Sequence, residues 1–258
     1  MTGKTRKTYI VGIGASAGGL EAISLLVSNL RVDLPCAYVV LQHISPDYRS
    51  MMAEILSRET QLKVKELKDG DIPEPGSIFV VPAKSNALIQ EGKFHLVDTS
   101  PKIVPKPSIN QFLISLAAEE GEAAIGIILS GTGSDGVAGL RAIQAAGGFT
   151  LVQSPHTAKY DGMPRSAIEA NVADHILPPV EIANFLPKLL DIPNLEDHAQ
   201  HYIDPLKRLL SHLKEQLQID FTGYKLSTLT RRIHRRQHVT ECLDLSDYLE
   251  WIEEHPEE

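Results

Sequence analysis

The sequence predicts an α/β fold: a doubly wound, mostly parallel sheet with an antiparallel hairpin section, followed by a small C-terminal all-α domain. Over about the first 190 residues, short apolar β-branched runs alternate with amphipathic segments of helix length, which is typical of a parallel sheet covered by helices. In the middle of this part, Glu91-Gly92 separates two short strand-like runs and indicates a hairpin. After Leu190 the leucines take up helical spacing instead.

The elements of the first part follow one another in a regular order. We expect strands at about 9–13, 37–41, 78–81, 87–90, 94–97, 124–129 and 150–153. We expect helices at about 19–30, 47–58 and 108–120, and a further helix from a second glycine-rich turn to about 146. The runs at 78–81, 87–90 and 94–97 lie close together, so they are predicted to form the antiparallel section.

Three segments are predicted: an α/β domain at 1–190, a linker at 191–202 and a helical domain at 203–258. The linker is polar, contains proline and lacks periodicity. Beyond it, one helical face carries Leu206, Leu209, Leu210, Leu213 and Leu217. Residues 202–238 hold 8 Lys or Arg against 3 Asp or Glu, whereas 239–258 hold 8 acidic residues and no Lys or Arg. Such a split fits either two solvated faces or a basic surface for an acidic partner.

The composition is that of a soluble globular protein. Of 258 residues, 43% are hydrophobic and 22% charged, which excludes wholesale disorder. No apolar run approaches the ~18–20 residues of a membrane span, and no signal peptide is present, so we expect a cytoplasmic protein without membrane insertion. The net charge of −8 argues against nucleic acid as a partner. The only cysteines, Cys36 and Cys242, are far apart, which argues against a disulfide framework or a zinc site.

The first glycine-rich turn, Gly12-Ile-Gly14-Ala-Ser16-Ala-Gly18-Gly19, has two interpretations. As Gly-x-Gly-x-x-Ala it matches a dinucleotide-binding fingerprint, but the acidic residue that should follow the second strand is missing from Leu41-Gln-His43. As Gly-x-Ser-x-Gly it matches a nucleophile elbow, in which Ser16 stands on a tight strand-to-helix turn. A helix N-cap is the simplest role for Ser16 alone.

A base and an acid follow two other predicted strands. His43 comes directly after the second strand, and Asp135 lies in Gly131-Thr-Gly-Ser-Asp-Gly136 after the strand at 124–129. Taken singly, His43 could be a packing residue and Asp135 an N-cap of the helix that begins near Val137. Parallel strands end at one edge of a sheet, so Ser16, His43 and Asp135 are predicted to converge there as a Ser-His-Asp triad.

These motifs resemble the catalytic domain of the CheB chemotaxis methylesterase. The resemblance runs from about Tyr9 to Leu190 and also includes Pro107-Ser-Ile-Asn110 and Asp161-Gly-Met-Pro-Arg165. It puts Ser16, His43 and Asp135 on the catalytic serine, histidine and aspartate. The sequence departs from the family at Ala17, where Thr is frequent, and at Thr132, where the family has Met; both departures concern the fit of the substrate more than the chemistry.

The C-terminal part resembles the N-terminal helical domain of the CheR methyltransferase. The residues that carry this resemblance are 219–225, 230–236, 248–249 and 255–258. We therefore expect the front part of a CheB–CheR fusion, without the receiver domain that precedes the esterase in the family. Because the S-adenosylmethionine-binding domain is also missing, no methyltransferase activity is expected.

The resemblance implies a serine hydrolase of adaptation in chemotaxis-type signal transduction. It would remove methyl groups from glutamate γ-methyl esters of chemoreceptor-like proteins, and deamidation of matching glutamines could accompany this. No metal or organic cofactor is implied. The partner would be a methylated chemoreceptor or receptor-like sensor; the oligomeric state is left open.

A basic edge in the tail is the candidate receptor contact. Arg231, Arg232, Arg235 and Arg236 lie at helical spacing, and the alternative is a solvated helix face. Two other functions stay open for the whole chain. One is a catalytically silent regulatory or scaffold module that binds receptors or controls the methyltransferase; the other is a dinucleotide-dependent oxidoreductase.

Overall fold

The computed structural model describes residues 8–43, 51–98, 107–190, 199–219 and 245–255, together with residues 221, 229, 232–233, 236–237, 240 and 242. The chain divides into two compact units, Met1–Lys188 and Leu189–Glu258.

The first unit contains a seven-stranded parallel sheet and a separate two-stranded antiparallel hairpin. Across the main sheet the strand order is β3-β4-β2-β1-β7-β8-β9. The strands are β1 (Tyr9–Ala15), β2 (Cys36–Gln42), β3 (Lys63–Glu66), β4 (Ser77–Val80), β7 (Ala124–Ile128), β8 (Phe149–Gln153) and β9 (His175–Leu177), and the hairpin consists of β5 (Ser85–Gln90) and β6 (Lys93–Asp98). The predicted fold class is confirmed.

The order of the strands creates a switch point between β1 and β7. From β1 the chain builds β2, β4 and β3 on one side, and later adds β7, β8 and β9 on the other. In open α/β sheets, ligands bind beyond the carboxyl ends of the strands at such a point. β1 pairs with β2 from Tyr9↔Cys36 to Ala15↔Gln42, so the ends of these two strands lie level with each other.

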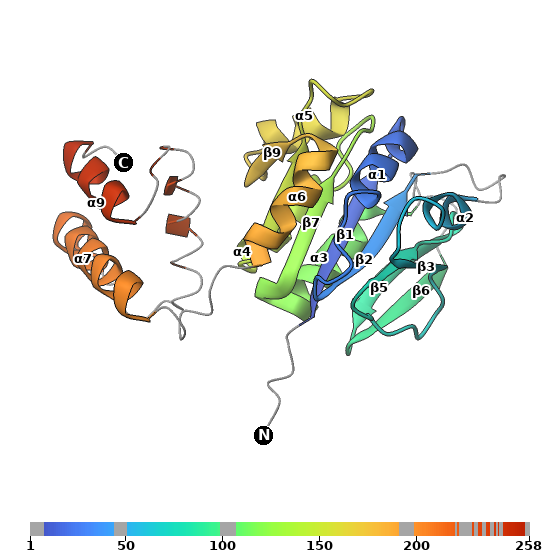
Figure 1. The fold of residues 1–258 in the computed structure, drawn as a ribbon, viewed down its shortest axis with the longest axis horizontal. Coiled ribbons are helices and arrows are strands. Elements are labelled where there is room, and N and C mark those ends of the chain that lie inside the picture. The colour runs from blue at the N-terminus through green and yellow to red at the C-terminus, as the bar shows by residue number, and fades with distance from the viewer. Residues whose placement is uncertain are drawn as a thin grey trace. The chain divides into compact units, whose positions relative to one another are not determined.

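Helices cover both faces of the sheet. The helices of this unit are α1 (Gly19–Val27), α2 (Met52–Leu56), α3 (Ile109–Glu120), α4 (Val137–Ala145), α5 (Gly162–Glu169) and α6 (Pro179–Leu190), with a short 3₁₀ turn, η1 (Gly121–Ala123). Figure 1 shows α1 and α6 in front of the central strands and α3 behind them.

Glycines in β1 let α3 pack close to the sheet. A Cβ at Gly12 would overlap Leu113 of α3, and one at Gly14 would overlap Ile109. Alternate residues of a strand face opposite sides, so Ala15 faces away from α3 and lies against Gly19 at the start of α1. Small residues on both faces of the end of β1 therefore bring the first turns of α1 and α3 close to the edge where Ser16 lies.

Several expectations for individual elements need correction. The run at 78–81 is not antiparallel: β4 pairs in parallel with β2, and the antiparallel pairing is confined to β5 and β6 around the turn at Glu91 and Gly92. Strands β3 and β9 were not predicted. Helix α1 ends at Val27, three residues early, and α2 covers only Met52–Leu56 of the expected 47–58; residues 44–50 lie outside the described part.

Among the described residues of the second unit, two helices have defined bounds, α7 (Ala199–Leu217) and α9 (Leu245–Glu254). Its core consists of Leu206, Leu209, Ile233, Leu245, Tyr248, Leu249 and Ile252. The leucine spacing of 206–217 thus forms a helix as expected, although α7 begins at Ala199, inside the predicted linker; residues 191–198 of that linker lie outside the described part. Within the described residues, no helix is both long enough and apolar enough to span a membrane.

Candidate active site

The three predicted site residues follow three neighbouring strands. Ser16 comes after β1, His43 after β2, and Asp135 lies in the loop between β7 and α4. β1 stands between β2 and β7 in the sheet, so the loops of the outer two strands flank the turn that carries Ser16. This edge is the carboxyl end of the sheet at its switch point.

Ser16 lies on a tight turn between β1 and α1. Its N–H donates to the carbonyl of Ser130 over 2.9 Å, and its carbonyl accepts the N–H of Gly19 over 2.8 Å. Gly18 is the N-cap of α1 with a φ of 69°, a left-handed conformation that glycine adopts without strain. The simple role of a helix cap therefore belongs to Gly18, and the half-buried Ser16 side chain makes no cap hydrogen bond.

His43 is held by a carboxylate from the far side of β1. Its Nε2 lies 3.0 Å from Oδ2 of Asp135, and only 8% of the His43 side chain and 12% of the Asp135 side chain are exposed. The backbone N–H of His43 also continues the β1–β2 pairing by donating to the carbonyl of Ala15 over 3.1 Å. The structure thus brings His43 and Asp135 together; the hydroxyl of Ser16 makes no hydrogen bond to any residue in the described part of the chain.

Asp135 accepts hydrogen bonds at both of its oxygens. Oδ2 takes the His43 ring nitrogen and the N–H of Ile109 over 2.9 Å, while Oδ1 takes the N–H groups of Asn110 and Gly136, each over 3.0 Å. Ile109 and Asn110 are the first two residues of α3, so the carboxylate sits at the positive end of that helix. Both carboxylate oxygens are therefore held in place, and this fixes the position of the acceptor that faces the His43 ring.

These contacts determine the ionisation of Asp135. Burial by itself raises the pKa of the carboxyl group, but the hydrogen bonds from His43, Ile109 and Asn110, with the charge of the His43 ring, outweigh it and lower the pKa below its ordinary value of 3.8. Asp135 is therefore a carboxylate at neutral pH, and it accepts the proton carried by Nε2 of His43.

Asn110 returns the contact to the loop of Asp135. Its Oδ1 accepts the N–H of Gly136 over 3.0 Å and that of Gly139 over 2.9 Å, and so it caps α4. The alternative that Asp135 caps the helix beginning near Val137 is therefore incomplete, because Asp135 mainly serves α3 while Asn110 serves α4. Asn110 was expected only as part of the Pro107–Asn110 motif, without a role of its own.

Gln42 and Ser130 are two further residues that sequence analysis missed. The side-chain amide of Gln42 donates to the carbonyl of Ser16 over 2.6 Å and, more weakly, to that of His43 over 3.4 Å. A Cβ at Gly19 would overlap this amide, so the glycine leaves room for it. Ser130 is fully buried, and its Oγ donates to the carbonyl of Ala17 over 2.9 Å. The only signal for them in the sequence was their place in the chain, since Gln42 precedes His43 and Ser130 precedes Gly131.

The motif Asp161–Arg165 packs against the second glycine-rich turn, residues 131–136. Met163 is fully buried, and a Cβ at Gly131 would overlap its sulfur and would also lie 2.9 Å from Cβ of Ser16. A Cβ at Gly162 would lie 3.2 Å from the nitrogen of Gly133. These close approaches explain why glycine is needed at two positions around the Ser16 turn.

The predicted arginine edge is only partly described. Arg231 and Arg235 lie outside the described residues, whereas Arg232 and Arg236 are exposed. Ile233 and Gln237, each the next residue along the chain, are buried. The two described arginines therefore lie on the outside of the second unit, and their contact with a receptor stays a prediction.

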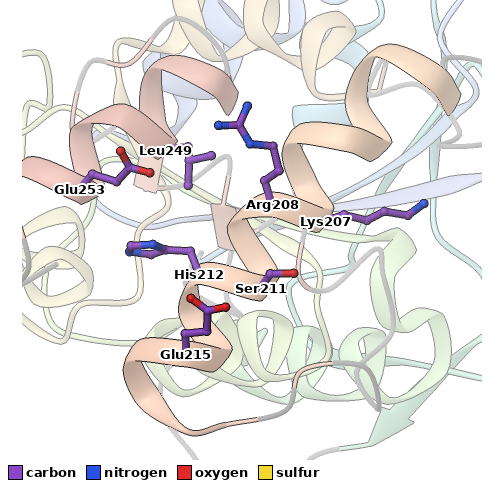
Figure 2. A pocket seen from close by; sticks show the side chains of 7 residues that line it. All are labelled: Lys207, Arg208, Ser211, His212, Glu215, Leu249 and Glu253. Carbon is purple, nitrogen blue, oxygen red and sulfur yellow. The ribbon is translucent and has the colours of Figure 1, made fainter.

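A separate pocket of about 340 Å³ lies between α7 and α9 in the second unit. Its lining, labelled in Figure 2, includes Lys207, Arg208 and Glu215 of α7 and Glu253 of α9. Two positive and two negative side chains favour neither an anion nor a cation. Among the described residues, no group of three His, Cys, Asp or Glu side chains could hold a metal ion.

Comparison with known proteins matches both parts of the chain. The CheB methylesterase model matches residues 11–186, and the model of the CheR methyltransferase all-alpha domain matches residues 204–258. A protein-glutamate methylesterase/protein-glutamine glutaminase of Anaeromyxobacter dehalogenans is 34% identical over 186 residues, covering 72% of this chain and 54% of that protein. One from Geobacter sulfurreducens is 35% identical over 189 residues, covering 71% and 52%. The chain thus spans about half the length of these curated relatives.

A solved structure matches the first unit. The crystal structure of the Thermotoga maritima CheB methylesterase catalytic domain superimposes with a TM-score of 0.67 and 31% identity, covering 71% of this chain and 99% of that one. The dinucleotide-binding interpretation of the first turn has no counterpart in these matches.

Proposed function

This chain belongs to the CheB methylesterase family and continues into a CheR-type all-alpha domain, and we propose that its first unit is a serine hydrolase of protein glutamate γ-methyl esters. The observation that carries the proposal is the hydrogen bond of 3.0 Å between His43 Nε2 and Asp135 Oδ2, made beside the turn that presents Ser16. Relatives named protein-glutamate methylesterase/protein-glutamine glutaminase support the same class of reaction and extend it to glutamine deamidation.

In the proposed reaction, the hydroxyl oxygen of Ser16 attacks the ester carbonyl while His43 takes its proton. Because Nε2 of His43 faces Asp135, the remaining ring nitrogen, Nδ1, is the base. His43 then returns the proton to the departing methoxide, and methanol leaves. A water molecule, deprotonated by the same nitrogen, hydrolyses the acyl-enzyme to glutamate and free Ser16.

Backbone N–H groups are the proposed donors to the oxyanion. Ala17, in the turn before α1, and Gly133, in the second turn, have N–H groups that donate to no other described residue. The N–H of Gly131 is not available for this role, because it donates to the carbonyl of Tyr160 over 2.9 Å. One donor of this kind contributes roughly 3 kcal/mol to stabilising the transition state.

The second unit is proposed to bind the receptor. Membership of CheB and CheR families implies a chemoreceptor as the partner. Arg232 and Arg236 are exposed on this unit and offer guanidinium groups suited to carboxylates of an acidic receptor segment. A cytoplasmic location of the protein belongs to the same proposal.

The test is methanol release from a methyl-esterified receptor fragment. Ser16→Ala should lower the rate by roughly 10⁴-fold or more while the melting temperature stays close to that of the wild type. Ser134→Ala is the matched control, since this exposed serine lies in the loop of Asp135 and should leave the rate unchanged. A Ser16→Ala protein with a tenth of the wild-type rate would refute the role of Ser16. No release from the wild type would favour the silent regulatory module.

A further inference from the structure

Tyr160 lies against the turn that carries Ser16. It belongs to the loop that leaves β8, and its side chain is 44% exposed. A Cβ built on Gly18, two residues after Ser16, would lie 3.1 Å from Cδ2 of Tyr160 and 3.0 Å from Cβ of Lys159. The Tyr160 ring therefore stands directly beside the backbone of the nucleophile turn, and part of it faces solvent.

The backbone of Tyr160 is tied to both glycine-rich turns. Its N–H donates to Oγ of Ser130 over 3.0 Å, and its carbonyl accepts the N–H of Gly131 over 2.9 Å. Ser130 Oγ in turn donates to the carbonyl of Ala17, next to Ser16. An aromatic side chain on a backbone fixed in this way loses little further freedom when it binds a partner.

An exposed apolar residue also follows the nucleophile turn in the chain. Leu20, two residues after Gly18 in the first turn of α1, is a large apolar side chain that is 39% exposed. Exposed apolar side chains that gather around a reactive group mark a binding surface more often than scattered ones do. Lys159, the residue before Tyr160 in the chain, is also exposed and carries a positive charge.

We propose that Tyr160 and Leu20 form the contact surface for the substrate segment. They would pack on the aliphatic stem of the esterified glutamate and its apolar neighbours, while Lys159 faces carboxylates of the same segment. This inference rests on the proposed function. The acidic occupant follows from the chemistry, since each hydrolysis leaves one more glutamate carboxylate in the segment beside Lys159. Tyr160 is thus a specificity-determining residue of the reaction.

The experiment measures binding without turnover. In the full chain carrying Ser16→Ala, the dissociation constant for a methyl-esterified receptor fragment is compared with and without Tyr160→Ala. We expect Tyr160→Ala to weaken binding about tenfold and Tyr160→Phe, which keeps the ring, to leave it within about twofold. Leu20→Ala should weaken binding less. Leu25→Ala is its matched control, because Leu25 is a leucine on the same helix that is somewhat more exposed, at 47%.

Two further readouts separate a contact from a structural role. In the active enzyme, Tyr160→Ala should raise KM more than it lowers kcat, with an unchanged melting temperature. Lys159→Glu should weaken binding at low salt and lose its effect at high salt. Unchanged affinity of Tyr160→Ala would overturn this inference alone. A wild type that releases no methanol would overturn the proposed function, while binding to the Ser16→Ala chain would still decide the role of Tyr160. No binding to the Ser16→Ala chain would overturn this inference, whereas methanol release by the wild type decides the proposed function.

Discussion

Asp135 in the first unit accepts four hydrogen bonds from α3, His43 and its own loop, whereas the core of the second unit consists of apolar residues from α7, α9 and Ile233. Gln237, a buried polar residue of the second unit, has a side-chain oxygen without a partner in the described part of the chain. The difference between the two units lies in how precisely their side chains are positioned. Directional hydrogen bonds fix the side chains of a candidate site to within tenths of an ångström, while apolar contacts hold a fold together with more tolerance.

The largest effect is expected for Asp135→Asn. The amide cannot accept hydrogen bonds at both ends, and it does not hold the His43 tautomer, so methanol release should fall by roughly 10³- to 10⁴-fold. Stability of the first unit should fall by about 1–3 kcal/mol, because one backbone N–H loses its acceptor. Asp33→Asn is the control, since Asp33 is 61% exposed and pairs with Arg31. Activity within tenfold of the wild type would contradict the catalytic role of Asp135.

For Leu209→Ala the main expected effect is on the stability of the second unit and not on methanol release. Leu209 is fully buried in the core of the second unit, and its truncation should cost that unit about 2–5 kcal/mol. Urea unfolding followed by Trp251 fluorescence measures this directly, because Trp251 is the single tryptophan and stacks on His255 in this unit. Leu217→Ala is the matched control on the same helix, with 54% exposure. If Leu209→Ala left the fluorescence transition in place, the described core would be wrong.

A smaller effect is expected for Asn110→Ala. Its amide oxygen caps α4 through two N–H groups, and loss of a cap costs about 1–2 kcal/mol. The cap also fixes the loop of Asp135, so kcat should fall as well. Unfolding of the whole chain in urea is followed by circular dichroism. The part of the signal that changes together with Trp251 fluorescence is assigned to the second unit, and the remaining transition reports the first unit. Asn29→Ala, on the surface of that unit, should change neither its stability nor kcat. Equal effects from Asn110→Ala and Asn29→Ala would refute the role of Asn110 as the cap of α4.

The smallest effect concerns acid stability. The pKa of Asp135 is lowered in the folded protein, so its carboxylate stabilises the fold above the ordinary value of 3.8, and this contribution is lost as the pH falls through the lowered pKa. The urea midpoint of the first unit should therefore drop more between about pH 5 and about pH 3 in the wild type than in Asp135→Asn. Parallel curves for the two proteins would show that Asp135 does not contribute.

The sequence predicted much of the fold because alternation of apolar strands and amphipathic helices is a local signal. Strand β3 was missed because Lys63-Val-Lys-Glu66 carries one apolar residue, and β9 because it has three residues. The pairing of the run at 78–81 was mistaken because proximity in sequence to a hairpin does not decide which sheet a strand joins.

Within the site, Ser16, His43 and Asp135 could be proposed because each follows a strand, and parallel strands end at one edge. The roles of Gln42 and Asn110 could not be proposed in this way. Gln42 reaches Ser16 only because it lies level with Ala15 across β1 and β2, and Asn110 reaches Gly136 only because α3 packs beside α4. Such contacts depend on tertiary register, which no local pattern contains.

The tautomer of His43 tests the arrangement most directly. Nitrogen-15 NMR of the imidazole in the whole chain at neutral pH, assigned through the loss of its signals in His43→Gln, reports which ring nitrogen carries the proton. Asp135 at 3.0 Å from Nε2 predicts a proton on Nε2 and a bare Nδ1 available to Ser16, with this preference lost in Asp135→Asn. A proton on Nδ1, or the same tautomer in both proteins, would contradict it.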